Sequence, residues 1–255
     1  MVYKDNLLGV TIISSIVAGG VGTALTFMNG SICGKFNLAV IPGIAIMIFG
    51  TFVLPAICFI IRESASLHKR GIILLTSFII FSYFFTSPGI SPFAIIPMPI
   101  LLRIVGLIFG IGGNIAWCII CIKACKRVYE DKKLSCKIFV DNGNYFSYSI
   151  NNDAKMFEKT KFSFWRPAYL LIPIVPLYPL SLVLPKILIP IIGYSGICIF
   201  LGLLYIPFSI CLNGLLVKIV YAFFYYPRKL TRATGKPVYF ADYWGGPKKP
   251  YPGEK

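Results

Sequence analysis

The sequence predicts an all-α integral membrane protein: a bundle of about six transmembrane helices with a small cytoplasmic β-hairpin insertion and a basic, aromatic C-terminal tail. Hydrophobic residues make up 57% of the 255 residues, and the mean hydropathy is +0.78. Charged residues make up only 13%, whereas soluble domains carry about a quarter. A compact core cannot bury so much apolar surface, so we expect lipid to surround the chain.

The apolar runs give the positions of the expected helices. A helix needs about 20 apolar residues to cross the hydrocarbon core of a bilayer. Six runs approach or exceed this length, at 7–29, 37–61, 71–87, 98–123, 168–190 and 194–226. The first run is longer than the apolar part of a signal peptide and lacks a convincing cleavage site, so we expect a retained helix.

The basic residues predict the orientation, because cytoplasmic loops of membrane proteins accumulate Lys and Arg. If the N-terminus is cytoplasmic, only Lys35, Arg103 and Lys186 belong to the opposite side. Both termini are therefore expected in the cytoplasm, and the strong bias favours a bacterial inner membrane. The chain then divides into helices one to four, an insertion, helices five and six, and a tail, at 1–123, 124–167, 168–226 and 227–255.

The net charge of +16 is typical of proteins that bind nucleic acid or anionic lipid. Here the basic residues lie between apolar runs, so anionic headgroups on the cytoplasmic side are the expected partner. We expect no direct binding of nucleic acid.

The insertion contains the strongest short signal for a hairpin, Asn142-Gly143, between two runs of β-branched and aromatic residues at 136–140 and 145–150. A two-stranded hairpin alone is only marginally stable in water, so it should lean on the tail, another subunit or a soluble partner. After the hairpin, Asp153 is expected to cap a short helix that ends near Lys161.

The tail combines basic and aromatic residues. One interpretation is a disordered extension on anionic lipid, and the alternative is docking on a protein partner or on the hairpin. The candidate contact residues are Arg228, Lys229, Arg232, Tyr239, Phe240, Tyr243 and Trp244.

Small residues in the first and fourth spans allow close helix packing, within the chain or between copies in a homo-oligomer. The candidates are Gly19, Gly22, Gly106, Gly110, Gly113 and the neighbouring Asn114. Since an Asn side chain in lipid needs a partner, a pore or substrate site at Asn114 is the alternative.

Prolines should disturb two segments. Pro173, Pro176 and Pro179 predict a bent or partly unwound fifth span, either a kinked structural helix or a broken helix around a transport site. The prolines in 88–99 predict a re-entrant or surface-lying loop.

Groups for catalysis are scarce. The chain has one histidine, His68, and all nine acidic residues fall outside the predicted spans. We therefore expect no enzyme, no cofactor and no metal. A zinc site of His68 with the cysteines of the fourth helix and the insertion (Cys118, Cys121, Cys125 and Cys136) is less favoured than buried free thiols. A Cys33–Cys198 disulfide and an anion-binding Arg103 are minor alternatives.

The sequence contains no phosphate loop, nucleophile elbow or dinucleotide fingerprint. The leading hypothesis is a non-enzymatic membrane subunit that self-assembles or anchors a cytoplasmic partner. A channel or membrane-perturbing effector, for example in stress or antiviral defence against phage, is the second hypothesis, and a small-molecule transporter is the third.

Overall fold

The computed structural model describes residues 66–171 and 178–240, with a few positions between 20 and 49. Predictions that fall elsewhere lie outside the described residues. They concern the spans at 7–29 and 37–61, the glycines at 19 and 22, Cys33, Pro173 and Pro176 of the fifth span, and the tail beyond residue 240 with Tyr243 and Trp244.

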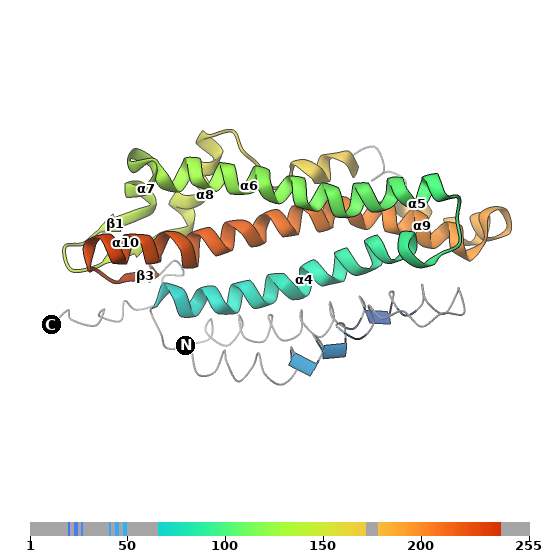
Figure 1. Cartoon of the computed structure of the whole chain (residues 1–255), viewed down its shortest axis with the longest axis horizontal. Coiled ribbons are helices and arrows are strands. Elements are labelled where there is room, and N and C mark those ends of the chain that lie inside the picture. The colour runs from blue at the N-terminus through green and yellow to red at the C-terminus, as the bar shows by residue number, and fades with distance from the viewer. Residues whose placement is uncertain are drawn as a thin grey trace.

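Long helices lie side by side in this part of the chain (Figure 1). In Figure 1, α9 (Tyr178–Val220) runs between α4 (Leu67–Ile95) and α6 (Gly113–Glu130). Helix α5 (Ile100–Leu107) and the π-helical turn η2 (Ile108–Gly112) lead into α6 without a break.

Three described segments are long and apolar enough to cross a membrane: Leu67–Ile95, Ile100–Glu130 and Cys198–Thr234. They overlap the predicted runs at 71–87, 98–123 and 194–226. The chain is therefore a mostly helical membrane protein.

The predicted loop at 88–99 is wrong for most of its length. Helix α4 continues through Pro88 and Pro92 to Ile95, and only 96–99 separate it from α5. A proline removes one backbone hydrogen bond, but unwinding the segment in lipid would leave several backbone groups unpaired. Continuing the helix through the two prolines therefore leaves fewer backbone groups unpaired than a loop would.

A separate fifth span at 168–190 is not confirmed. Residues Arg166–Leu171 form the 3-10 helix η3, and α9 runs without interruption from Tyr178 to Val220. The sequence around the expected break contains glycine and proline but no charged residue between 187 and 199. In apolar surroundings the helix satisfies the backbone there.

The insertion folds into α7 (Lys132–Ile138), β1 (Phe139–Asp141), β2 (Phe146–Tyr148) and α8 (Ile150–Lys159). Strand β1 pairs antiparallel with β2, and β2 pairs in parallel with β3 (Val238–Phe240) from the tail. The result is a three-stranded sheet in the order β1-β2-β3. The expected two-stranded hairpin is thus extended by the tail.

Two local predictions in the insertion are wrong. Cys136 lies in α7 and not in a strand, because the Asp131 carboxylate accepts the Lys133 N–H at 2.8 Å and starts that helix. The cap of α8 is Ser149, which accepts the Asn152 N–H, and Asp153 lies in the first turn.

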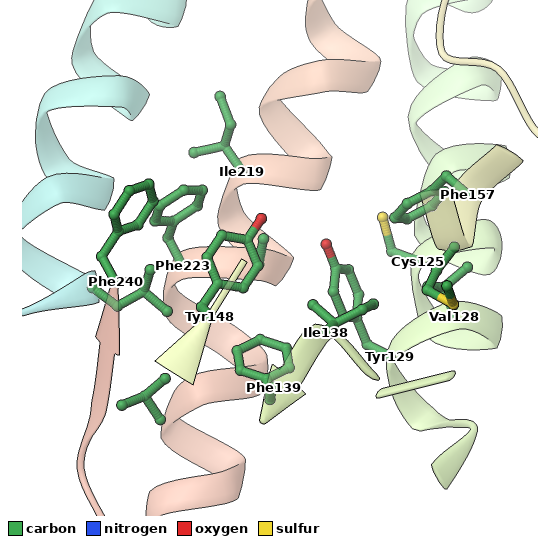
Figure 2. Packing of buried hydrophobic residues seen from close by; sticks show 14 of the residues in the cluster. Cys125, Val128, Tyr129, Ile138, Phe139, Tyr148, Phe157, Ile219, Phe223 and Phe240 are labelled. Carbon is green, nitrogen blue, oxygen red and sulfur yellow. The ribbon is translucent and has the colours of Figure 1, made fainter. Parts of the chain in front are cut away.

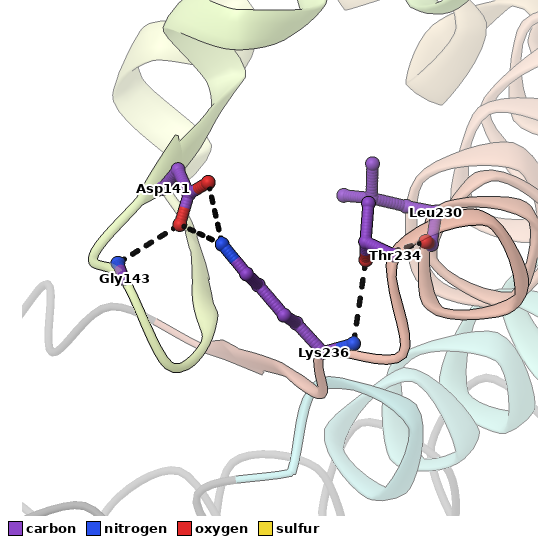
Figure 3. A network of polar contacts seen from close by, with 5 residues as sticks. All are labelled: Asp141, Gly143, Leu230, Thr234 and Lys236. Atoms are coloured by element: carbon purple, nitrogen blue, oxygen red, sulfur yellow. Dashed lines mark hydrogen bonds and ion pairs between the residues drawn. The ribbon is translucent and has the colours of Figure 1, made fainter.

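The tail reaches the sheet through η5 (Tyr221–Tyr225) and α10 (Tyr226–Thr234). Gly235 ends α10 with a φ of 73°, a left-handed conformation that favours glycine. Lys236 then donates hydrogen bonds to both carboxylate oxygens of Asp141 in β1, at 3.0 and 2.9 Å (Figure 3). This exposed ion pair ties the tail to the opposite edge of the sheet.

An aromatic core joins the sheet to the helices (Figure 2). Phe223 of η5 packs against Tyr148 of β2 and stacks on Phe240 of β3. On the other side, Phe139 of β1 packs against Tyr226 of α10. The sheet is therefore packed directly on the ends of the long helices.

Candidate functional site

A group of uncharged polar side chains lies halfway along the long helices. We call Ser82, Thr86, Asn114, Ser209 and Asn213 the mid-bundle cluster. Two members come from α4 and two from α9, each pair four residues apart and so on one helix face. Helix α6 contributes Asn114.

The hydrogen bonds of the mid-bundle cluster converge on the side-chain oxygen of Asn114. Asn213 Nδ2 donates to it at 2.5 Å, and Ser209 Oγ donates at 3.3 Å. Since the Ser209 proton is used there, Thr86 is the donor in the 2.6 Å contact between the two hydroxyls. Ser82 donates to Asn213 Oδ1 at 2.6 Å. Three helices are thus joined without a charge.

Two cavities have Asn213 in their linings. The first has a volume of about 470 Å³ and is lined by α4 from Ser82 to Ile95. The second, of about 320 Å³, lies between Cys118 and Ile122 of α6 and the stretch from Leu216 to Tyr221. The first cavity has a hydroxyl-bearing wall, whereas apolar residues dominate the second.

A second polar group, which includes a charge pair, lies where the sheet meets the helices. We call Tyr129, Tyr148, Asp153 and Lys218 the junction cluster. Asp153 is only 1% exposed, and its Oδ1 accepts the Tyr129 hydroxyl at 2.8 Å. Its Oδ2 accepts the Tyr148 hydroxyl at 2.9 Å and pairs with Lys218 Nζ at 2.9 Å. Both tyrosine hydroxyls donate to this carboxylate, and in Figure 2 the two hydroxyls point in the same direction.

The junction cluster is arranged as a structural link. Burial and the adjacent Asp153 raise the pKa of Tyr148 well above its ordinary value, so Tyr148 stays a neutral donor. The Lys218 ammonium also lies 4.7 Å from the ring centre of Phe157 in α8. None of the four members lines either cavity of the described region. The carboxylate therefore joins α8, β2, α6 and α9.

Sequence reasoning missed this group. It treated Asp153 as a helix cap, and it counted every acid as aqueous or interfacial. The signal that could have found it is Lys218, a lysine near the end of an apolar run that needs a buried partner or access to water.

The glycines predicted for packing contact other helices of the same chain. A Cβ on Gly106 would lie 2.0 Å from Phe93 of α4, and one on Gly110 would lie 3.1 Å from Ile90. A Cβ on Gly113 would lie 3.0 Å from Ile210 of α9. These three glycines therefore pack against helices of the same chain, beside Asn114.

The tail candidates separate into two groups. Arg228, Lys229 and Arg232 lie exposed on α10, where Lys229 is 3.6 Å from Glu130. Phe240 is buried in the aromatic core, and Tyr239 contacts Tyr145 at a ring distance of 5.6 Å. Of the two interpretations of the tail, docking on the hairpin therefore fits β3.

The cysteine, histidine and arginine candidates belong to neither of the two polar clusters. The described residues contain no group of three or more His, Cys, Asp or Glu side chains placed to hold a metal ion. His68 packs against the ring of Phe224 at 4.7 Å. Arg103 donates to the Ile96 carbonyl at 3.2 Å, next to the end of α4. The cysteines at 118, 121, 125 and 136 are free thiols.

The helices define the class of the molecule, a helical membrane protein with a small three-stranded sheet at one end. In comparisons with known proteins, no family, no curated protein and no solved structure matches the chain.

Proposed function

We propose that the chain is a non-enzymatic, multi-pass subunit of a bacterial inner membrane that self-assembles, anchors a cytoplasmic partner in a membrane complex, or does both. The anchoring part is a module made of α7, β1, β2, α8 and β3, on the cytoplasmic side with both termini. The proposal rests on one observation, the burial of Asp153 between this module and the long helices.

The junction cluster supports anchoring because it makes the module continuous with the bundle. Tyr129 and Lys218 belong to segments that are long and apolar enough to cross a membrane, whereas Tyr148 and Asp153 belong to the insertion. A soluble domain on a flexible linker would move independently of the helices. A module joined through a buried carboxylate transfers a load, or a change of position, directly to α6 and α9.

The surface of the module supports a partner with negative charge. Exposed lysines on α7 and α8 make this surface basic, at positions 132, 133, 137, 155 and 159. Such a surface complements an acidic protein face or anionic headgroups and speeds the encounter with either. Exposed basic residues of α10 extend the same charge toward the membrane boundary.

The composition of the purified complex tests this proposal. Native mass spectrometry of the full chain, extracted in a mild detergent, should show a stable soluble partner or additional copies of the chain. Replacing Lys132 and Lys133 by Glu should remove an acidic partner, while the neutral pair Lys132→Gln and Lys133→Gln should weaken it less. A strictly monomeric, partner-free particle would contradict the proposal.

The second candidate is a channel or membrane-perturbing effector, or a small-molecule transporter. It is favoured by the two cavities that share Asn213, in the middle of the described bundle. Conductance in planar bilayers or solute uptake into proteoliposomes would support it. Tight proteoliposomes that contain correctly folded protein would count against it.

A further inference from the structure

We propose that the first cavity binds a small, uncharged, hydroxyl-bearing molecule that enters from the end of the bundle remote from the sheet. This site concerns a different part of the molecule from the anchoring module and does not depend on the anchoring function.

The residues that line the cavity point to access from one end of the bundle. Its lining follows α4 from Ser82, in the middle of the helix, to Ile95, its last residue. These two residues are about 20 Å apart along a straight helix. The opposite half of α4 leads to the sheet, where Ser66 bridges to Tyr239 and aromatic side chains fill the core. The volume of about 470 Å³ lies within the range of small-molecule sites.

The lining favours an uncharged ligand. Its polar members are hydroxyl or amide groups, and the part of the wall that the structure describes contains no carboxylate, ammonium or guanidinium group. The residues are Ser82, Tyr83, Thr86, Ser87, Ser91 and Asn213. A charged ligand at this depth would need an opposite charge to replace its water, and the described residues of the lining offer none.

The inner end of the cavity offers donors and acceptors together. Asn213 uses one N–H toward Asn114, and its second N–H has no partner among residues 66–171 and 178–240. The hydroxyls of Ser82 and Thr86 donate hydrogen bonds to Asn213 and Ser209, so their oxygens can still act as acceptors for a ligand. A ligand hydroxyl both donates and accepts, and it fits this arrangement better than a purely apolar group or a cation.

Two hydroxyls of α4 outside the cavity have different partners. Thr76 and Ser77, nearer the sheet, donate to carbonyls of their own helix, Ile72 and Ile73. Ser82 and Thr86 instead bond across to α9, which keeps polar atoms at the cavity wall.

A matched pair of cysteine variants tests whether water reaches the cavity. Ile90→Cys places a thiol in the lining, and Ile111→Cys places one at similar depth on the outer face of η2, where Ile111 is 48% exposed. The depth is shared because Ile90 packs against Gly110. Each variant is reconstituted in nanodiscs and treated with the neutral reagent hydroxyethyl methanethiosulfonate. Peptide mass spectrometry distinguishes the new thiol from the native cysteines.

Ile90→Cys should react about tenfold faster than Ile111→Cys or more, because a reactive thiolate forms only where water or polar groups stabilise it. Equal rates would overturn the proposal, since the cavity wall would then be no wetter than the lipid-facing surface.

Protection by a probe tests the ligand class. Glycerol and myo-inositol should slow the modification of Ile90→Cys, and choline chloride at the same concentration should not. In the Asn213→Leu background, protection should require about tenfold more polyol, as expected for one lost hydrogen bond. Ser82→Ala gives the same test if the Leu variant misfolds, and Thr76→Val should leave protection unchanged. Failure of both polyols, or equal protection by choline, would overturn the proposed ligand class.

Discussion

The mid-bundle cluster and the junction cluster both connect three or more elements, but they use different chemistry. The mid-bundle cluster joins α4, α6 and α9 through amides and hydroxyls alone. The junction cluster joins α6, α9, α8 and β2 through a carboxylate and an ammonium group.

Position along the helices explains this difference. Lys218 lies near the sheet end of α9, and its side chain is 20% exposed, so it can reach water while it pairs with Asp153. Asn114 lies midway along its span, where a charged group would be much more costly to place in lipid. In the described part of the chain, neutral polar contacts therefore lie deep in the bundle, and the buried ion pair lies at the end near the sheet.

The largest effect should come from Asp153→Ala, which leaves the Lys218 ammonium and two tyrosine hydroxyls without their acceptor. We expect a loss of about 3 kcal/mol of unfolding free energy, within the range for breaking a buried pair. Thermal unfolding in detergent measures it, and Glu158→Ala, at an exposed position of α8, should change little. The double variant Asp153→Leu with Lys218→Met should recover part of the loss. A loss as small as that of Glu158→Ala would show that the junction is not the main link.

The next effect should come from Gly106→Ala, because the added Cβ would overlap the ring of the fully buried Phe93. We expect a loss of about 2 kcal/mol, as for overpacked cores. Gly112→Ala is the matched control, since the nearest atom to its Cβ is 3.8 Å away. Equal melting temperatures for the two variants would contradict the tight α4–α5 contact.

Asn114→Ala should have a smaller effect, about 1 kcal/mol, because hydrogen bonds between membrane helices are individually modest. Adding Asn213→Ala should then cost less than it does in the wild-type chain, since the two residues share one bond. A double-mutant cycle in detergent measures this coupling. Strictly additive losses would show that the two amides act independently.

The smallest effect should come from Lys236→Ala, which removes the exposed pair with Asp141. The Lys236 hydrogen bond, followed by the Gly143 N–H, lowers the pKa of Asp141. Its contribution is therefore present above the ordinary Asp value of about 4 and is lost as the pH falls through the lowered value. Hydrogen exchange of the β3 amides should distinguish Lys236→Ala from the wild type at pH 7 and not at strongly acidic pH. A difference that persists in acid would contradict this assignment.

Apolar runs predicted the helices well where the membrane dominates the choice of structure. The run at 71–87 lies within a span of the structure and the run at 98–123 overlaps another, and the prediction that Asn114 would seek a partner led to a residue of the mid-bundle cluster. The identity of its partners, Ser209 and Asn213, depends on how α9 is rotated against α6. That rotation is not encoded in the local sequence of either helix.

Local rules failed where residues distant in sequence decide the outcome. Asp153 matches the pattern of a helix cap, but Tyr129 and Lys218 make it a buried acceptor. Strand β3 had a local signal, three β-forming residues after Gly235 and Pro237. Pairing with β2 could not be read from it, because the partner lies far upstream in the chain.

The parallel pairing of β2 with β3 has a consequence for biogenesis. Strand β2 leaves the ribosome before α9 is made, whereas β3 follows the last long helix. The nascent sheet therefore keeps an unpaired edge until Val238–Phe240 has been made, and such edges favour aggregation and make chaperones useful. A chain truncated before Val238 would carry this unpaired edge permanently.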